Sequence, residues 1–249
     1  MLSRNHGSMT PDGPLRIPTP PSPKSERSPP GKLFSMPLLA WTLLSLAALL
    51  AWDLSGADLA LAQLAGDGHG FALRDNWFLS HIAHDGAKRL SWLLVLALCA
   101  GVWWPIGPLR RISMARRIEL ALAPLVAGVA VSSVKAFSLT SCPWDLQAFG
   151  GVATYLSHWH LAADGGPGHC FPGGHAAHGF SMLAGYFVFR EVDQRLAMRW
   201  LGAALLAGLL LGLVQQWRGA HFMSHTLWTA WLCWVLLWGL DAAWRRVAR

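Results

Sequence analysis

Charged residues are scarce in this sequence. Asp, Glu, Lys and Arg make up 13% of its 249 residues, whereas an ordinary soluble domain contains about 25%. Hydrophobic residues make up 53%, and there are 15 Trp. This composition excludes a disordered chain, a coiled coil, a collagen-like fibre and an ordinary soluble globule. It indicates a polytopic helical membrane protein.

Cysteine is scarce too, and four residues of it are too few for a disulfide scaffold. The net charge of +7 raises the question of a nucleic-acid partner. The basic residues, however, flank apolar runs and do not form one patch, so we expect no nucleic-acid binding.

Long apolar stretches dominate the rest of the chain. A membrane-spanning helix needs about 20 apolar residues, and only helices satisfy the backbone within each such stretch. The fourth stretch is short and begins in a polar loop, which leaves open a span or a helix buried in the bundle. We predict an all-α membrane bundle with about six transmembrane helices. The stretches are 34–52, 90–106, 117–137, 175–190, 197–216 and 225–243.

Lys and Arg gather on one side of these spans, which by the positive-inside rule places both termini in the cytoplasm. Residues 1–32 hold eight of the 15 Pro, which predicts a disordered cytoplasmic tail before a membrane-embedded domain, 33–249. A cleaved signal peptide is the alternative, but the first apolar run is too long for one. The outer loops 53–89 and 138–174 are long; we expect short amphipathic pieces of the first to lie at the membrane interface.

Three polar stretches lie at the outer ends of neighbouring spans. They are Lys135 to Cys142-Pro143, Pro172-Gly173-Gly174-His175, and Arg218 to His221 and His225. Ionisable residues at such positions are candidates for function. Two cations beside paired imidazoles suit a phosphate ester, because cations bind its oxygens while one His attacks phosphorus and another protonates the leaving group.

These stretches resemble the type 2 phosphatidic acid phosphatase and vanadium haloperoxidase superfamily. Its pattern is Lys-x6-Arg-Pro, then Pro-Ser-Gly-His, then Ser-Arg-x5-His-x3-Asp, and the resemblance covers roughly residues 90–240. It implies that His221 is the nucleophile and His175 the general acid. It also implies that Lys135 and the backbone N–H groups of Gly173 and Gly174 bind phosphate, with no metal or other cofactor.

The chain departs from the pattern at both arginines. Cys142 stands at the Arg of the first motif and Gln215 at that of the third. Arg218 follows one helical turn after Gln215, so we expect it to deliver a guanidinium from a shifted position, the alternative being an interfacial anchor.

The carboxylate that would orient the nucleophile is replaced by His225. A neutral His still accepts a hydrogen bond and fixes the tautomer of His221. Asp145 and Asp164 are candidates to supply the missing charge.

Cys142 and Cys170 both fall on the outer side, where disulfides persist. A bond between them would close a loop and stabilise the folded state by roughly 3–4 kcal/mol, because it lowers the entropy of the unfolded chain. Two free thiols remain the alternative.

The resemblance implies hydrolysis of a phosphomonoester or diphosphate on a membrane lipid through a phosphohistidine. Candidate substrates are undecaprenyl diphosphate, phosphatidate, phosphatidylglycerophosphate and lipid A phosphates. We expect the outer face of a bacterial inner membrane, with the site facing the periplasm. The alternatives are a lipid phosphotransferase, a membrane transporter, a zinc enzyme built on the paired histidines, and an inactive member that only binds.

Overall fold

The computed structural model describes residue 2 and residues 37–247. The predicted tail 1–32 therefore lies, apart from residue 2, outside the described residues. All described helices belong to a unit that begins at Leu38. The long helices are α1 (Leu38–Ser55), α3 (Ala87–Trp103), α4 (Met114–Ala136), α7 (Gln194–Trp217) and α8 (Met223–Val247).

The shorter elements lie between the long helices. They are α2 (Ala57–Gln63), strands β1 (Gly66–Asp67) and β2 (Gly70–Phe71), the π-helical turns η2 (Phe78–Gly86), the 3-10 turns η3 (Gly107–Arg111), η4 (Pro143–Asp145), η5 (Gln147–Phe149) and η6 (Ser181–Leu183), and helices α5 (Gly174–Phe180) and α6 (Ala184–Phe189).

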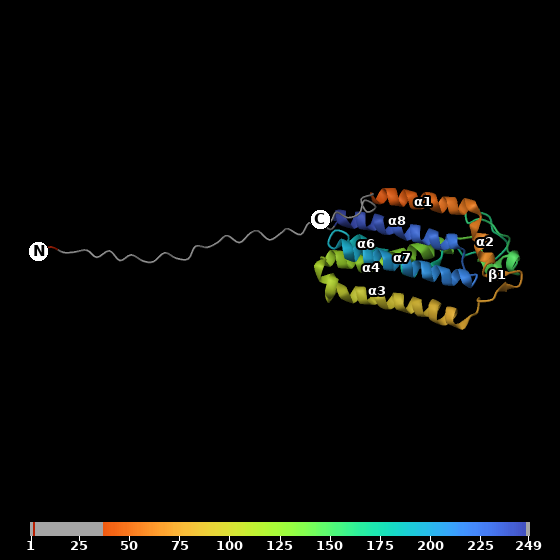
Figure 1. Ribbon diagram of the computed structural model, residues 1–249, viewed down its shortest axis with the longest axis horizontal. Coiled ribbons are helices and arrows are strands. Elements are labelled where there is room, and N and C mark those ends of the chain that lie inside the picture. The colour runs from red at the N-terminus through yellow and green to blue at the C-terminus, as the bar shows by residue number, and fades with distance from the viewer. Residues whose placement is uncertain (1, 3–36, 248–249) are drawn as a thin grey trace. The chain divides into compact units, whose positions relative to one another are not determined.

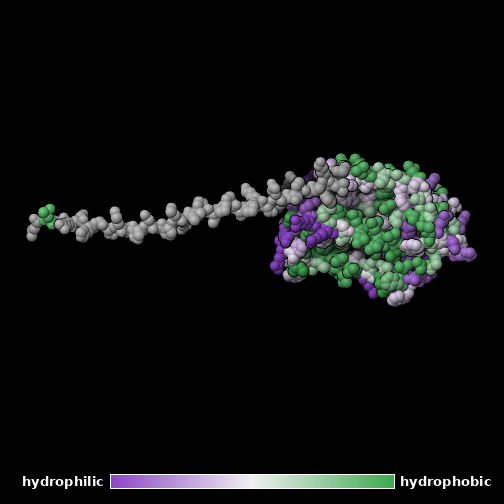
Figure 2. All heavy atoms as spheres, in the orientation of Figure 1, coloured by the Kyte–Doolittle hydropathy of each residue, from purple (hydrophilic) through white to green (hydrophobic). Residues whose placement is uncertain are grey.

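Five helical segments are long and apolar enough to cross a membrane, which confirms the all-α membrane bundle and makes the chain a multi-pass membrane protein. Figure 2 shows hydrophobic residues over the middle of the visible face and hydrophilic residues toward its two ends. That distribution matches an apolar bilayer core between polar interfaces. The segments are 38–55, 78–111, 114–136, 194–217 and 223–247.

The apolar stretch 175–190 is not one of these five. It forms α5, η6 and α6 in sequence, and these pack against α4, α7 and α8. Phe180, Leu183, Phe187 and Phe189 are each at most 1% exposed. Of the two structures that the sequence left open for this stretch, the described chain shows a short helix buried inside the bundle.

The loop predicted over 53–89 is also more helical than expected. Its second amphipathic piece forms η2, which runs directly into α3 as part of the long helical segment 78–111. His84 of this piece consequently lies against the bundle, where its ring stacks on that of His175.

Close packing of α5 on α7 depends on two glycines. A Cβ on Gly179 would overlap the backbone of Gly208, and a Cβ on Gly208 would overlap the Phe180 ring. Small residues let two helix backbones approach closely, which is how membrane helices gain packing contacts without a solvent-driven force. In Figure 1, α4, α6, α7 and α8 lie between α3 on one side and α1 on the other.

One end of this bundle holds a network of paired charges, and we call it the ion-pair end. The Asp241 carboxylate is fully buried and lies 2.8 Å from the Arg116 guanidinium, 2.9 Å from that of Arg190 and 2.9 Å from that of Arg245. Arg116 also pairs with the buried Glu119. Buried charges require this kind of pairing because desolvation otherwise costs several kcal/mol per ion.

The other end, which we call the site end, is covered by α2, the β1–β2 hairpin and the segment between α4 and α5 (Figure 1). A small apolar cluster holds these pieces together. It consists of Ala62, Phe71, Leu146, Phe149, Ala153 and Phe222. Phe222 directly follows His221, so the cluster also fixes the α7–α8 connection.

Candidate functional site

The three polar stretches meet at the site end. Lys135 is in the last turn of α4, Gly174 and His175 begin α5, and His221 lies between α7 and α8. The Lys135 side chain passes over Gly174, with Cδ 3.9 Å from the position a Cβ would take there. The predicted gathering of these motifs is what the fold produces.

The turn between α7 and α8 sets the position of His221. Gly219 has a φ of 75°, in the left-handed region that favours glycine, and a Cβ there would overlap the Phe71 ring. The Ala220 N–H donates to the Gln215 carbonyl over 2.8 Å, which closes the end of α7. The chain therefore reverses within a few residues.

Asp58 of α2 fixes the start of α8. Its Oδ1 accepts from the Ser224 N–H over 2.9 Å and from Trp52 Nε1 over 2.9 Å. A carboxylate at a helix N-terminus satisfies a free N–H and interacts favourably with the helix dipole. His221 and His225 thus lie on either side of an anchored N–H group.

The rings of His221 and His225 meet edge-on, with an angle of 63° between their planes. Their Nδ1 atoms are 3.4 Å apart, and the side chains are 6% and 1% exposed. A hydrogen bond between these atoms needs a proton on one Nδ1 and a lone pair on the other. If His221 donates, its Nε2 keeps a lone pair.

The surroundings of His221 favour the neutral imidazole. Burial, followed by the charge of Lys135 and then by His225 and His175, holds the pKa of His221 well below the ordinary value of 6.5. Only the Cys170 main chain opposes this. A neutral imidazole is the form that can act as a nucleophile.

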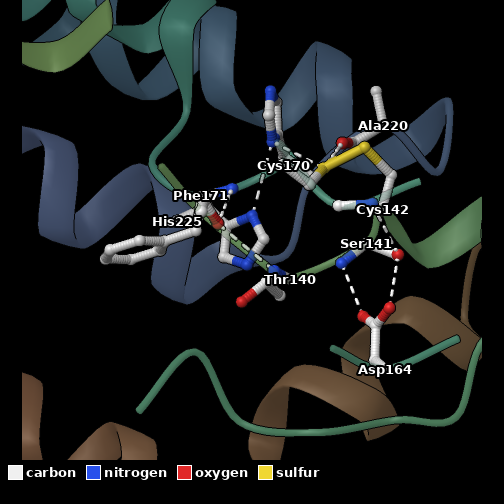
Figure 3. Close-up of a disulfide and its surroundings, with 11 residues drawn as sticks. Thr140, Ser141, Cys142, Asp164, Cys170, Phe171, Ala220 and His225 are labelled. Carbon is white, nitrogen blue, oxygen red and sulfur yellow. Dashed lines mark hydrogen bonds between the residues drawn. A yellow bond between two sulfur atoms is a disulfide. The ribbon is translucent and has the colours of Figure 1, made fainter. Parts of the chain in front are cut away.

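A disulfide joins Cys142 and Cys170, with their Cα atoms 5.1 Å apart (Figure 3). The bond ties the segment after α4 to the segment before α5. Cys170 Sγ also lies 3.4 Å from His221 Nδ1 and 2.9 Å from the Ala220 carbonyl oxygen. The bridge therefore packs directly against the α7–α8 connection.

Asp164 supports this bridge, and its carboxylate makes no bond to a histidine among the described residues. Its carboxylate accepts from the Ser141 N–H over 2.6 Å and from the Ser141 hydroxyl over 2.7 Å, as Figure 3 shows. Asp145 forms no side-chain bond to His221 or His225 among the described residues. Neither candidate supplies the carboxylate that the third motif lacks.

The N–H groups at the start of α5 differ in availability. The Gly173 N–H donates to Thr229 Oγ1 over 2.9 Å and approaches the His225 carbonyl at 3.3 Å. Thr229 in turn donates to that carbonyl over 2.6 Å. The Gly173 N–H, predicted to bind phosphate, is thus already used to join α5 to α8. The next N–H, at Gly174, makes no such bond to the residues that the structure describes.

His175 lies beside these groups. Its Nε2 is buried and has no hydrogen-bond partner within the described chain. Its ring stacks on that of His84 with centroids 3.6 Å apart. Sequence reasoning missed His84, since the pattern gave no sign that η2 continues α3 across the site.

The Arg218 guanidinium is bound outside the group formed by Lys135, His175 and His221. Its Nε donates to the Arg74 carbonyl over 3.0 Å and its Nη1 to Gln215 Oε1 over 3.4 Å. The described residues give it no contact with Lys135, His175 or His221. Gln215, at the family's Arg position, is 2% exposed, and its Nε2 has no partner in the described part of the chain.

The structure also reveals a carboxylate near the histidines that sequence reasoning did not find. Asp53 Oδ2 accepts from Trp159 Nε1 and from Trp228 Nε1, each over 2.9 Å, and lies 3.4 Å from His158 Nε2. Asp53, His158 and His225 line one small cavity. Burial lowers the pKa of His158, and the Asp53 charge opposes that shift.

The structure thus defines a multi-pass helical membrane protein with a lysine and several histidines at one end of its bundle. A family model described as the PAP2 superfamily matches residues 117–247, more than half of the chain. The chain belongs to this superfamily, which confirms the resemblance and indicates a phosphatase acting on phosphate esters. No curated protein and no solved structure matches the chain.

Proposed function

We propose that the protein hydrolyses the phosphate group of a membrane lipid through a phosphohistidine on His221. The observation that carries this proposal is the buried, neutral His221, held against His225 beside Lys135 and His175. An apolar bundle gives such a substrate a place for its tail in the bilayer, while its phosphate reaches the site end.

His221 Nε2 attacks phosphorus, and the bond from phosphorus to the lipid oxygen breaks. His225 accepts the Nδ1–H of His221, which holds the reactive tautomer and position, a role that a carboxylate performs in other catalytic sites. The Asp53 carboxylate, which lines the same cavity as His225, adds a negative charge as the imidazole becomes positive.

His175 donates a proton to the departing lipid oxygen and later takes one from water. Burial, followed by His84, His178 and then the two lysines Lys135 and Lys88, lowers the pKa of His175 to about 3. A dianionic phosphate entering the site opposes this shift and favours the protonated form that this step needs. Its unpartnered, buried Nε2 is free to face the leaving group. Water then attacks the phosphohistidine and releases inorganic phosphate.

Lys135 and the Gly174 N–H bind the phosphate oxygens. A fixed cation and a helix N-terminus act where negative charge develops in the transition state. Arg218 would join them only after leaving the Arg74 carbonyl, so we assign it a minor part. Gln215 Nε2, buried and without a partner among the described residues, is a further candidate donor.

We also propose the cellular setting. The tail 1–32 precedes a membrane-embedded domain, 33–249, with both termini cytoplasmic and the site facing the periplasm of a bacterial inner membrane. The excess of Lys and Arg at the opposite side supports this orientation. Undecaprenyl diphosphate, phosphatidate, phosphatidylglycerophosphate and lipid A phosphates remain the substrate classes to compare.

The test is phosphate release from these lipids in detergent, with chelator present, by the wild type, His221→Ala and His160→Ala. His160 is an exposed histidine outside the site and serves as the matched control. We expect His221→Ala to lose roughly 10³-fold or more in rate, while His160→Ala keeps the wild-type rate. Equal rates for wild type and His221→Ala would overturn the proposal.

The same assay separates hydrolysis from phosphotransfer. With a second lipid alcohol present, a phosphotransferase forms a new lipid phosphate and little inorganic phosphate. A hydrolase releases inorganic phosphate whatever alcohol is added, and its phosphate carries one oxygen from labelled water.

A further inference from the structure

Three potential metal ligands are close together beside the disulfide. Cys170 Sγ, His221 Nδ1 and His225 Nδ1 all lie within 4.8 Å of one another. They are buried, at 0%, 6% and 1% exposure, respectively. Cys170 Sγ is bonded to Cys142 in this structure and is no metal ligand in that state.

The spacing of two of the three pairs of these atoms matches a tetrahedral zinc site, and the third pair lies within 4.8 Å. With Zn–N near 2.0–2.1 Å and Zn–S near 2.3 Å, two nitrogen ligands are about 3.3 Å apart, and a nitrogen and a sulfur about 3.5 Å. The structure has 3.4 Å between the two Nδ1 atoms and 3.4 Å between Cys170 Sγ and His221 Nδ1. Each of these two distances needs only a small change for the pair of atoms to hold the ion.

The fourth ligand is the other half of the disulfide. Cys142 is covalently attached to Cys170, so its sulfur is next to the same position once the bond is broken (Figure 3). Two thiolates and two neutral imidazoles around Zn²⁺ have no net charge. A neutral group suits this buried place, because a bare charge there carries a large desolvation cost.

We propose that reduction of the Cys142–Cys170 disulfide converts this place into a Cys₂His₂ zinc site formed by Cys142, Cys170, His221 and His225. A dithiol reductant supplies two electrons and two protons and leaves as a cyclic disulfide, and the S–S bond becomes two thiols. Zn²⁺ then displaces the two thiol protons, which pass to water.

The consequence for turnover rests on the proposed function. Zinc on Nδ1 of His221 occupies the lone pair or displaces the proton there, and the neutral imidazole then carries its proton on Nε2. That nitrogen no longer has a lone pair for attack on phosphorus. Reduced, zinc-loaded protein is therefore inactive, whereas the oxidised protein ignores zinc.

The first experiment measures zinc retention without any substrate. Full-length protein in detergent is left oxidised or reduced with dithiothreitol, desalted without air, exposed to zinc sulfate, desalted again and assayed for metal. We expect about one zinc ion per chain after reduction and close to none in the oxidised sample. Equal zinc in the two samples would overturn the proposal.

Variants at the two cysteines sharpen this test. Cys142→Ser leaves Cys170 as a thiol beside both histidines, so it should retain zinc even without reductant. Cys170→Ser removes the sulfur that lies 3.4 Å from His221 Nδ1. This variant should retain no more than about one tenth of the zinc that Cys142→Ser retains. Equal retention by the two variants would contradict the assigned ligands. Cys99→Ser, at a free cysteine, is the matched control and should behave as wild type.

The second experiment measures phosphate release by the same samples. With free zinc at ten times its Kd, the reduced protein should lose about tenfold in rate and regain it when a chelator is added. Zinc retention without this loss would refute the inhibitory part alone. Absence of phosphate release in every sample would instead count against the proposed function, since the retention experiment does not depend on it.

Discussion

The two ends of helix α8 lie in opposite electrostatic environments. Near its C-terminus, the buried Asp241 carboxylate is surrounded by three guanidinium groups. Near its N-terminus, His221 and His225 lie beside Lys135, which has no ion-pair partner among the described residues. Paired charges stabilise the fold, whereas an unpaired cation is available for an anionic ligand. One helix thus carries separate groups for stability and for chemistry.

Breaking the ion-pair end should produce the largest effect. Asp241→Ala leaves Arg116, Arg190 and Arg245 short of a partner, and we expect it to lower the free energy of unfolding by about 3–5 kcal/mol. Thermal unfolding in detergent checks this, with Asp75→Ala, at an exposed acid outside this network, as the control. The rate per folded molecule should not change; a fall in rate without a fall in stability would contradict the division between the two ends.

Removing the unpaired Lys135 cation should lower the rate of phosphate release and leave the stability intact. We expect Lys135→Met to lower the rate of phosphate release by roughly 10²–10³-fold, because a fixed charge on the transferring phosphoryl group is lost. Its unfolding temperature should equal or exceed that of wild type, since no ion pair is broken. A less stable variant with a normal rate would show that Lys135 serves the fold.

The pH dependence offers a finer test of the site end. The pKa of His221 lies below its ordinary value of 6.5, so the neutral nucleophile persists as pH falls and is lost only below that value. The acid limb of kcat/KM should therefore lie below pH 6.5, and Lys135→Met should move it upward, because one cause of the depression is removed. An acid limb above pH 6.5 in wild type would contradict a depressed nucleophile pKa.

The smallest effect concerns Arg218. Its guanidinium is bound to the Arg74 carbonyl and Gln215, so Arg218→Ala should change the rate by less than about threefold, in line with a half-buried residue outside the transition-state contacts. A loss comparable to that of Lys135→Met would show that the side chain moves into the site when substrate binds.

Much of this arrangement could be predicted from local patterns. Hydropathy identified the helices, and the motif spacing identified Lys135, His175 and His221, because each signal is contained in one short stretch. Contacts between residues far apart in the sequence could not be predicted. The use of the Gly173 N–H by Thr229, and the approach of Asp53 to His158 and Trp159, depend on how helices pack. Burial of α5 and α6 likewise depends on their neighbours and not on their own composition.

The disulfide makes the segment between its two cysteines a closed loop. Residues 143–169 leave and return at points whose Cα atoms are 5.1 Å apart, so the segment is a closed lariat whose stem is fixed beside the histidines. Leu146, Phe149 and Ala153 of this segment belong to the cluster that holds the α7–α8 connection, so these positions are constrained. Its exposed positions, among them Val152 and Leu161, can diverge among descendants without displacing Lys135 or His221.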